Sequence, residues 1–170
     1  MTIEQLNTLS IDEAVTLFRQ SCGSLRWANT MQERRPFRDV LQLVAVADEV
    51  WNGLSPDDWK EAFSHHPKIG DIKDLRKRFP ATAQLSEGEQ AGLAVTAEKV
   101  LKALADGNNL YEAKFGYIFI VCATGKTAEE MLKLLNTRLN NIPSEEIKIA
   151  ADEQAKITRL RLERLFNDKK

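Results

Sequence analysis

The sequence predicts an all-α protein, and three patterns indicate this. Capping residues precede most of the apolar runs, apolar positions recur with the 3.6-residue helical period, and glycine or proline closes several runs. Only residues 117–123, YIFIVCA, could pass as a strand. Because no second run could pair with it, we expect a short, buried, extended stretch. With 170 residues, we expect one domain over 1–170 with a real core.

The first two helices are predicted from local signals. Ser10 and Glu13 form a capping-box pattern ahead of an apolar run, and Gly23 provides its stop. A short second helix around Trp27 is expected to end by Pro36, because proline cannot continue a helix.

The next segments continue the helical pattern. Ser55 as cap and Pro56 at the first helical position predict a helix start. Asp71 is expected to start another short helix that ends at Pro80. Between Gly23 and Ser55, residues 37–53 carry an apolar stripe with helical spacing, formed by Phe37, Val40, Leu41, Val44, Ala47 and Trp51.

Three further helices are expected towards the C-terminus. They start near residues 86, 127 and 144, and each combines a cap with helical periodicity. The breaks between elements are expected near 81–85 and 105–109, and neither has the composition of a domain linker.

Composition argues against several classes of function. The 24 basic and 25 acidic residues nearly cancel, which does not favour a nucleic-acid partner. No window approaches 18 apolar residues and the N-terminus lacks a secretory pattern, so we expect a cytoplasmic protein without a membrane partner. Cys22 and Cys122 form no CxxC pair, so no metal site is predicted.

Both histidines of the chain stand side by side on one corner. Pro67 restricts the backbone of His66, and Gly70 permits a sharp turn or a close approach. A stiff corner suits a general base, because a base must be held in one position. The alternative is a pair of exposed or hydrogen-bonded histidines, His65 and His66, in a loop after a helix.

A second candidate spot is SEGEQ, residues 86–90. Ser86 and Glu89 have the spacing of a capping box, which is the structural interpretation. A carboxylate at a helix N-terminus is also held rigidly, and the neighbouring Gln90 amide can donate and accept hydrogen bonds.

The third spot is Arg161 in the last predicted helix. It falls in the middle of the helix face formed by Ile147, Ala150, Gln154, Ile157 and Leu165, whereas Arg159 points away. A guanidinium on an apolar face needs an anionic or carbonyl partner to offset its desolvation. Either a substrate or a structural ion pair, for example with Glu89, would supply one.

These spots, with their flanking residues, resemble the 2-oxo-4-hydroxy-4-carboxy-5-ureidoimidazoline (OHCU) decarboxylases of urate degradation. The resemblance runs from about residue 15 to 165. It is carried by RRPF at 34–37, HPKIG at 66–70, SEGEQAGL at 86–93, KFGYIFIVCATGK at 114–126 and ITRLRL at 157–162.

The resemblance implies an all-α fold of about nine helices, a homodimer, and a carboxy-lyase without metal or organic cofactor that converts OHCU to (S)-allantoin. Its catalytic residues would be His66, Glu89 and Arg161. Substrate would be bound by Pro67, Ser86, Gln90 and the backbone around Phe119, Ile120 and Val121.

Two alternatives remain open at this stage. In a non-catalytic helical interaction module, the corner, the cap and the arginine would each have only a structural role. A lyase acting on a related ureido acid would keep the same residues. Activity that titrates near neutrality through His66 would distinguish an enzyme from the module.

Overall fold

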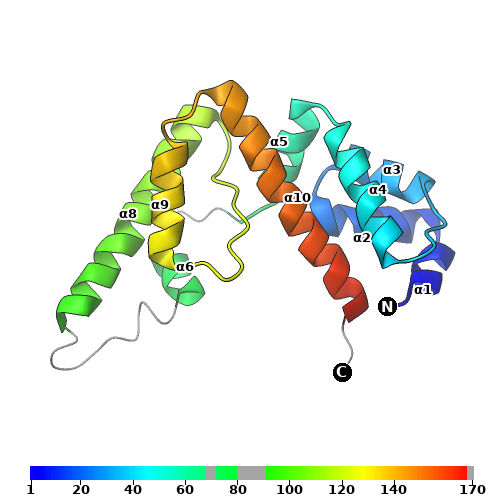
Figure 1. The fold of residues 1–170 in the computed structure, drawn as a ribbon, viewed down its shortest axis with the longest axis horizontal. Coiled ribbons are helices and arrows are strands. Elements are labelled where there is room, and N and C mark those ends of the chain that lie inside the picture. Colours follow the sequence, from blue (N-terminus) through cyan, green and yellow to red (C-terminus); the bar gives the residue numbers. More distant parts are fainter. Residues whose placement is uncertain (68–71, 80–90, 168–170) are drawn as a thin grey trace. The chain divides into compact units, whose positions relative to one another are not determined.

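The computed structural model describes residues 1–67, 72–79 and 91–167, and within them the chain forms nine α-helices and no β-strand (Figure 1). The all-α prediction is confirmed. None of these described helices has the length and apolar character needed to cross a membrane. The helices are α1 (Ile3–Thr8), α2 (Ile11–Cys22), α3 (Leu25–Glu33), α4 (Val40–Asn52), α5 (Pro56–Ser64), α6 (Ile72–Arg78), α8 (Ala91–Phe115), α9 (Ala128–Arg138) and α10 (Pro143–Asn167).

The chain folds as two compact units. The first holds Met1–His66, Ile120–Cys122 and the chain from Ile149 onward, and the second holds Pro67–Phe119 and Ala123–Lys148. Helix α10 contributes residues to both units, so the units are not consecutive pieces of sequence. That the whole chain acts as one domain stays a prediction.

Capping builds the first unit as the sequence predicts. Ser10 Oγ accepts the backbone N–H of Glu13, and the Glu13 carboxylate accepts the N–H of Ser10, 2.9 Å away. Helix α2 then ends at Gly23, whose φ of +101° favours glycine. Helix α3 packs against α2, and the ring of Phe18 meets that of Trp27 edge-on at 5.9 Å.

The stripe predicted for residues 37–53 is partly wrong. Asp39 caps α4 by accepting the N–H of Gln42, so Phe37 is buried ahead of the helix rather than within it. Leu41 is 82% exposed, because it lies two positions before the buried Leu43 and therefore about 200° around the helix from it. The buried face of α4 is formed by Leu43, Ala47, Val50 and Trp51.

Helices α8 and α9 lie side by side in the second unit (Figure 1). Helix α8 continues without interruption through 105–109, so the break predicted there is wrong. A Cβ atom added to Gly107 would lie 2.6 Å from Cδ2 of Leu135 in α9. Gly107 therefore permits a close approach of two helices and does not end one.

Other local predictions have mixed outcomes. Residues 117–123 belong to neither a helix nor a strand and are largely buried, as expected. Helix α1, with its capping box between Thr2 and Gln5, was missed. Helix α10 begins at Pro143, one residue before the predicted cap. The short helix expected between Asp71 and Pro80 is present as α6. Asp71 and Pro80 themselves, the start expected at residue 86 and the break at 81–85 lie outside the described residues.

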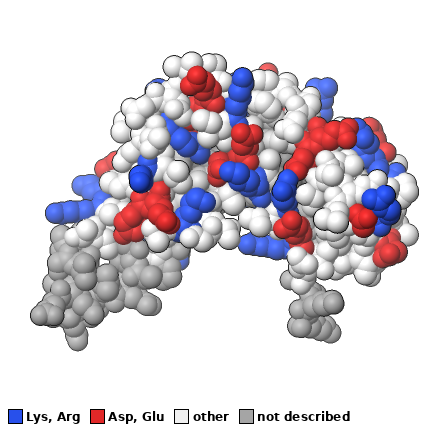
Figure 2. Space-filling view, in the orientation of Figure 1, with Lys and Arg blue, Asp and Glu red and all other residues white. Residues whose placement is uncertain are grey.

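Charged side chains of both signs are interspersed on the face drawn in Figure 2. Among the described residues, pairs such as Arg34 with Glu49 and Arg76 with Glu98 bring opposite charges together at the surface. The expectation that nucleic acid is not a partner stays a prediction.

Candidate functional site

The histidine corner is formed as α5 ends. His65 is the residue after the helix, and its N–H donates to the carbonyl of Ala62, 3.2 Å away. The N–H of His66 donates in the same way to Phe63, 3.1 Å away. Gly23 lies against this turn, since a Cβ atom there would be 3.0 Å from the Ala62 oxygen and from the His65 Cβ. The C-terminal end of α2 therefore supports the corner.

The two neighbouring imidazoles have different surroundings. His66 is half-buried, and its Nε2 atom lies 2.5 Å from Oε1 of Gln154 in α10. His65 is exposed and lines an open groove of about 470 Å³ beside Arg19 and Gln20 of α2. His66 thus has a defined partner in the core of the first unit, whereas His65 faces solvent.

Gln154 is a site residue to which the sequence analysis gave no role. Its side chain is fully buried, and its Nε2 atom donates to the Cys22 carbonyl at 3.3 Å and to Thr158 Oγ1 at 3.1 Å. Burying an amide requires such partners, because an unsatisfied polar group in the core is costly. A polar residue amid the apolar positions of the last helix was the signal that could have indicated it.

Arg161 has a carbonyl partner. Its Nη1 atom donates to the backbone oxygen of Ser21, 3.1 Å away, and burial lowers the pKa of its half-buried guanidinium. Within the described part of the chain it makes no ion pair, and Glu89 lies outside that part. Arg159 is exposed and pairs with Asp48, which agrees with the prediction that it points away from the apolar face of the last helix.

The predicted face of the last helix needs a correction. Ile147, Ile157 and Leu165 are only half-buried. Arg161 therefore lies at the border of the buried face and not in its middle, where its guanidinium can reach both protein and solvent. The buried positions of this half of α10 are Ala150, Ala151, Gln154, Thr158 and Leu162.

Ser21 and Cys22 are consecutive residues at the end of α2, and their carbonyls hold Arg161 and Gln154 respectively. The last carbonyls of a helix lack partners within the helix and carry partial negative charge, which stabilises a cation. Burial raises the pKa of the Cys22 thiol to about 11, so this thiol is neutral near pH 7 and is not a nucleophile.

Residues Phe119, Ile120 and Val121 are buried and belong to no helix or strand. The next residue, Cys122, donates its N–H to the carboxylate of Glu153, 2.7 Å away. This hydrogen bond ties the irregular segment to α10 within the first unit. Backbone groups outside regular elements can serve a ligand, which is the role expected for this segment.

An ionic network in the second unit holds the ring of Phe119. The Arg138 guanidinium lies 4.7 Å from the centre of that ring and 2.6 Å from Oε1 of Glu146, which is fully buried. Tyr111 and Asn141 also donate to the Glu146 carboxylate. Burial raises the pKa of the Tyr111 hydroxyl well above its usual range, which keeps it a donor. Sequence reasoning did not find this network.

Several predicted site residues are not placed. Ser86, Glu89 and Gln90 lie outside the described residues, so their roles stay predictions. Pro67 follows His66 directly and is exposed. Two predicted site residues do meet the same helix end. Arg161 donates directly to the Ser21 carbonyl of α2, and His66 contacts Gln154, which donates to the next carbonyl, that of Cys22.

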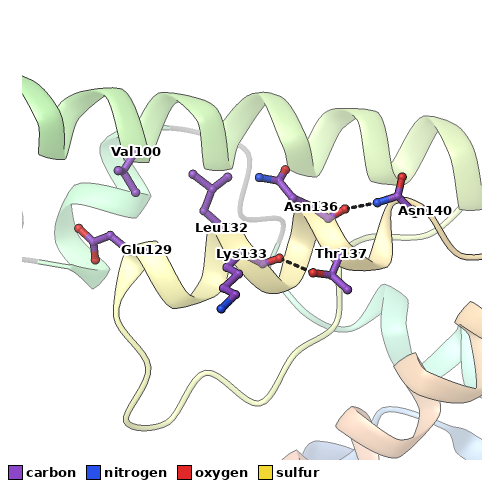
Figure 3. Close-up of a pocket in the computed structure, with 7 residues that line it drawn as sticks. All are labelled: Val100, Glu129, Leu132, Lys133, Asn136, Thr137 and Asn140. Atoms are coloured by element: carbon purple, nitrogen blue, oxygen red, sulfur yellow. Dashed lines mark hydrogen bonds between the residues drawn. The ribbon is translucent and has the colours of Figure 1, made fainter.

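A groove on α8 and α9 in the second unit has a volume of about 490 Å³ (Figure 3). Figure 3 shows Leu132 pointing towards α8 and Lys133 pointing away from it. The hydroxyl of Thr137 and the amide of Asn140 donate to carbonyls of their own helical segment, so they do not converge on the groove. The groove contains no predicted site residue and no arrangement suited to acid–base chemistry. It is lined by Val100, Glu129, Leu132, Lys133, Asn136, Thr137 and Asn140.

Comparison with known proteins identifies the family. The model of the OHCU decarboxylase family matches residues 7–163. The chain belongs to the OHCU decarboxylase family. The OHCU decarboxylase of Amia calva is 30% identical over 166 residues, which are 96% of this chain and 93% of that protein. The uric acid degradation bifunctional protein TTL of Arabidopsis thaliana is 39% identical over 87% of this chain, which spans about half (46%) of that longer protein.

Solved structures agree with this membership of the OHCU decarboxylase family. A crystal structure of OHCU decarboxylase in the presence of (S)-allantoin superposes with a TM-score of 0.70 and is 38% identical. The match covers 89% of this chain and 97% of that one. An (S)-allantoin synthase, 20% identical, has the same fold at a TM-score of 0.70.

Proposed function

We propose that this protein is a lyase that decarboxylates OHCU to (S)-allantoin in urate degradation and needs no cofactor. The observation that carries the proposal is its similarity, along nearly the whole length of both chains, to an OHCU decarboxylase crystallised in the presence of (S)-allantoin. The half-buried imidazole and guanidinium, each with a defined partner in the first unit, are suited to this chemistry.

The substrate contains its own electron sink. Its carboxylate and a hydroxyl share one ring carbon, which is next to a C=N bond. When the bond to CO2 breaks, its electron pair forms a C=C bond, and the C=N pair moves to nitrogen, which takes a proton. The resulting enol then loses its hydroxyl proton, and the ring carbon that carries the ureido group gains one. Protonation on one face of this planar intermediate sets the (S) configuration.

Each predicted residue would have its own role in this reaction. His66 would take the hydroxyl proton or orient the carboxylate, and Glu89 would bind the same region and set the protonation of His66. Arg161 would hold carboxylate or ring oxygens and stabilise developing negative charge. Ser86 and Gln90 would hold the ureido arm. Pro67 and the backbone of Phe119, Ile120 and Val121 would shape the pocket around the ring.

Circular dichroism tests the reaction directly. Urate is converted by urate oxidase and hydroxyisourate hydrolase with and without this protein. Spontaneous decay gives racemic allantoin and no lasting signal, so a rapid rise of the (S)-allantoin signal is expected only with the protein. A flat trace from well-folded protein would favour a lyase acting on a related ureido acid or a non-catalytic helical module.

The state and location of the protein form part of the same proposal. The family resemblance favours a homodimer, which sedimentation velocity would test through the mass in solution. The cytoplasmic location expected from the sequence is part of this proposal. A fluorescent fusion found outside the cytoplasm would contradict it.

A further inference from the structure

We propose that Gln154 is a positioning residue that keeps a proton on Nε2 of His66, so that proton exchange with substrate takes place at Nδ1. This inference rests on the proposed function, because it assigns one atom of the proposed base. It starts from the 2.5 Å contact between His66 Nε2 and Gln154 Oε1.

The orientation of the Gln154 amide follows from its other partners. One end of the amide lies 3.3 Å from the carbonyl oxygen of Cys22, which can only accept a hydrogen bond. That end must be the NH2 group, since an oxygen there would face another oxygen. Thr158 Oγ1, 3.1 Å away, accepts from the same NH2 group. The amide oxygen is therefore the atom that faces His66.

The orientation of the amide determines the state of the imidazole. An amide oxygen only accepts, so Nε2 of His66 must carry the proton that is donated to Gln154. In a neutral imidazole one nitrogen donates and the other accepts. With Nε2 protonated in both states of the ring, the proton gained or lost is the one on Nδ1.

The surroundings make this arrangement stable. Gln154 is fully buried, so its amide cannot exchange partners with water, and reversing it would place oxygen against the Cys22 carbonyl. The Cys22 carbonyl belongs to the end of α2, which is fixed by the turn at Gly23. The tautomer of His66 is thus set by backbone structure through one intervening side chain, as a carboxylate sets it in other acid–base sites.

Nitrogen NMR of the full chain tests the assignment without an activity measurement. The chain has two histidines, so a ¹⁵N-histidine sample gives two imidazoles, and a His65→Gln variant assigns His66. In the neutral state, His66 is expected as a single tautomer with a proton on Nε2 that exchanges slowly with water. A protonated Nδ1 with a bare Nε2 would overturn the proposal.

Substitutions then connect the tautomer with turnover. Gln154→Met keeps the approximate volume but removes the acceptor, so the Nε2 proton should lose its protection and kcat should fall at least about 10-fold. Thr158→Val is the matched control, because the Cys22 carbonyl still orients the amide, and it should keep both the signal and kcat within about 3-fold.

The proposed function and the positioning role of Gln154 can be refuted independently of each other. A protected Nε2 proton in a wild-type protein that makes no (S)-allantoin would refute the proposed function and leave the tautomer assignment in place. If the wild type is active and Gln154→Met keeps both the protected Nε2 proton and the wild-type kcat, the role of Gln154 is refuted. Folding of each variant is checked by the dispersion of its amide spectrum.

Discussion

Arg161 donates a hydrogen bond from Nη1 to the backbone oxygen of Ser21, 3.1 Å away, at the C-terminal end of α2. The next carbonyl along the chain, that of Cys22, accepts from Gln154, which in turn contacts His66. One helix end therefore positions both the guanidinium and the imidazole of the candidate site. Because these carbonyls carry partial negative charge, they also stabilise the half-buried cation.

Replacing Arg161 by glutamine should reduce kcat/KM about 10²–10³-fold, because developing negative charge on the substrate would lose its cationic partner. Steady-state kinetics by the dichroism assay measures this. Arg159→Gln is the control, since that exposed side chain on the same helix pairs with Asp48, and it should stay within about 3-fold of wild type. Equal losses in both variants would mean that Arg161 has no special role.

The stability of the protein should decrease in alkaline solution through Cys22. Burial raises the pKa of this thiol to about 11 from its usual 9.0, so the unfolded chain releases the proton at lower pH than the folded chain does. The raised pKa of the thiol therefore contributes about 2–3 kcal/mol to the unfolding free energy. This contribution is fully present below about pH 9 and is lost as the pH rises through about 11.

Urea unfolding of wild type and Cys22→Ala, both under reducing conditions, measures this effect. Between pH 8 and pH 10.5 the wild type should lose about 2 kcal/mol more unfolding free energy than the variant. Other titrating groups are common to both proteins and cancel in the difference. A difference that does not change with pH would show that the thiol is not buried as described.

The buried network around Glu146 should contribute more to the unfolding free energy than a surface ion pair does. Glu146→Gln removes the buried carboxylate charge that pairs with the Arg138 guanidinium, which should cost about 3–5 kcal/mol of unfolding free energy. Glu49→Gln is the matched control, because its surface pair with Arg34 should be worth about 0.5 kcal/mol or less. Similar losses in chemical denaturation of the two variants would contradict the burial of the network.

A methyl group at Gly107 should destabilise the second unit, although alanine is the better helix former. Its Cβ would lie 2.6 Å from Leu135, whose side chain is fully buried and has little room to move. We expect Gly107→Ala to cost about 1–3 kcal/mol in urea unfolding. At Gly53 the nearest atom is 3.6 Å away, so Gly53→Ala should be neutral or stabilise by up to about 1 kcal/mol. Stabilisation at both positions would rule out close packing at Gly107.

Local features of the fold could be predicted because they depend on neighbouring residues. The capping box predicted at Ser10 and the cap predicted at Ser55 are both present, and each involves a residue three positions further along the chain. The error at Gly107 has a physical cause, since glycine at a helix end and glycine at a helix contact look alike in sequence. Only the approach of Leu135, which follows it by 28 positions, separates the two cases.

The candidate site was predicted in its residue types but not in its connections. The corner at His66 and the charge at Arg161 are visible in the sequence, and the family motifs around them indicate their chemistry. The partner of His66 could not be predicted, because Gln154 is 88 positions away and any buried polar residue could have served. Glu146 was likewise ambiguous, since an acidic residue in the first turn of a helix is usually a solvated one.

The most direct test of the central claim compares His66→Ala and His65→Ala in the production of (S)-allantoin, followed by circular dichroism. The two imidazoles are adjacent, yet only His66 contacts the core through Gln154. We predict that His66→Ala loses about 10²–10⁴-fold in kcat, whereas His65→Ala stays within about 3-fold of wild type. A His66→Ala protein that folds and turns over at nearly the wild-type rate would contradict the account.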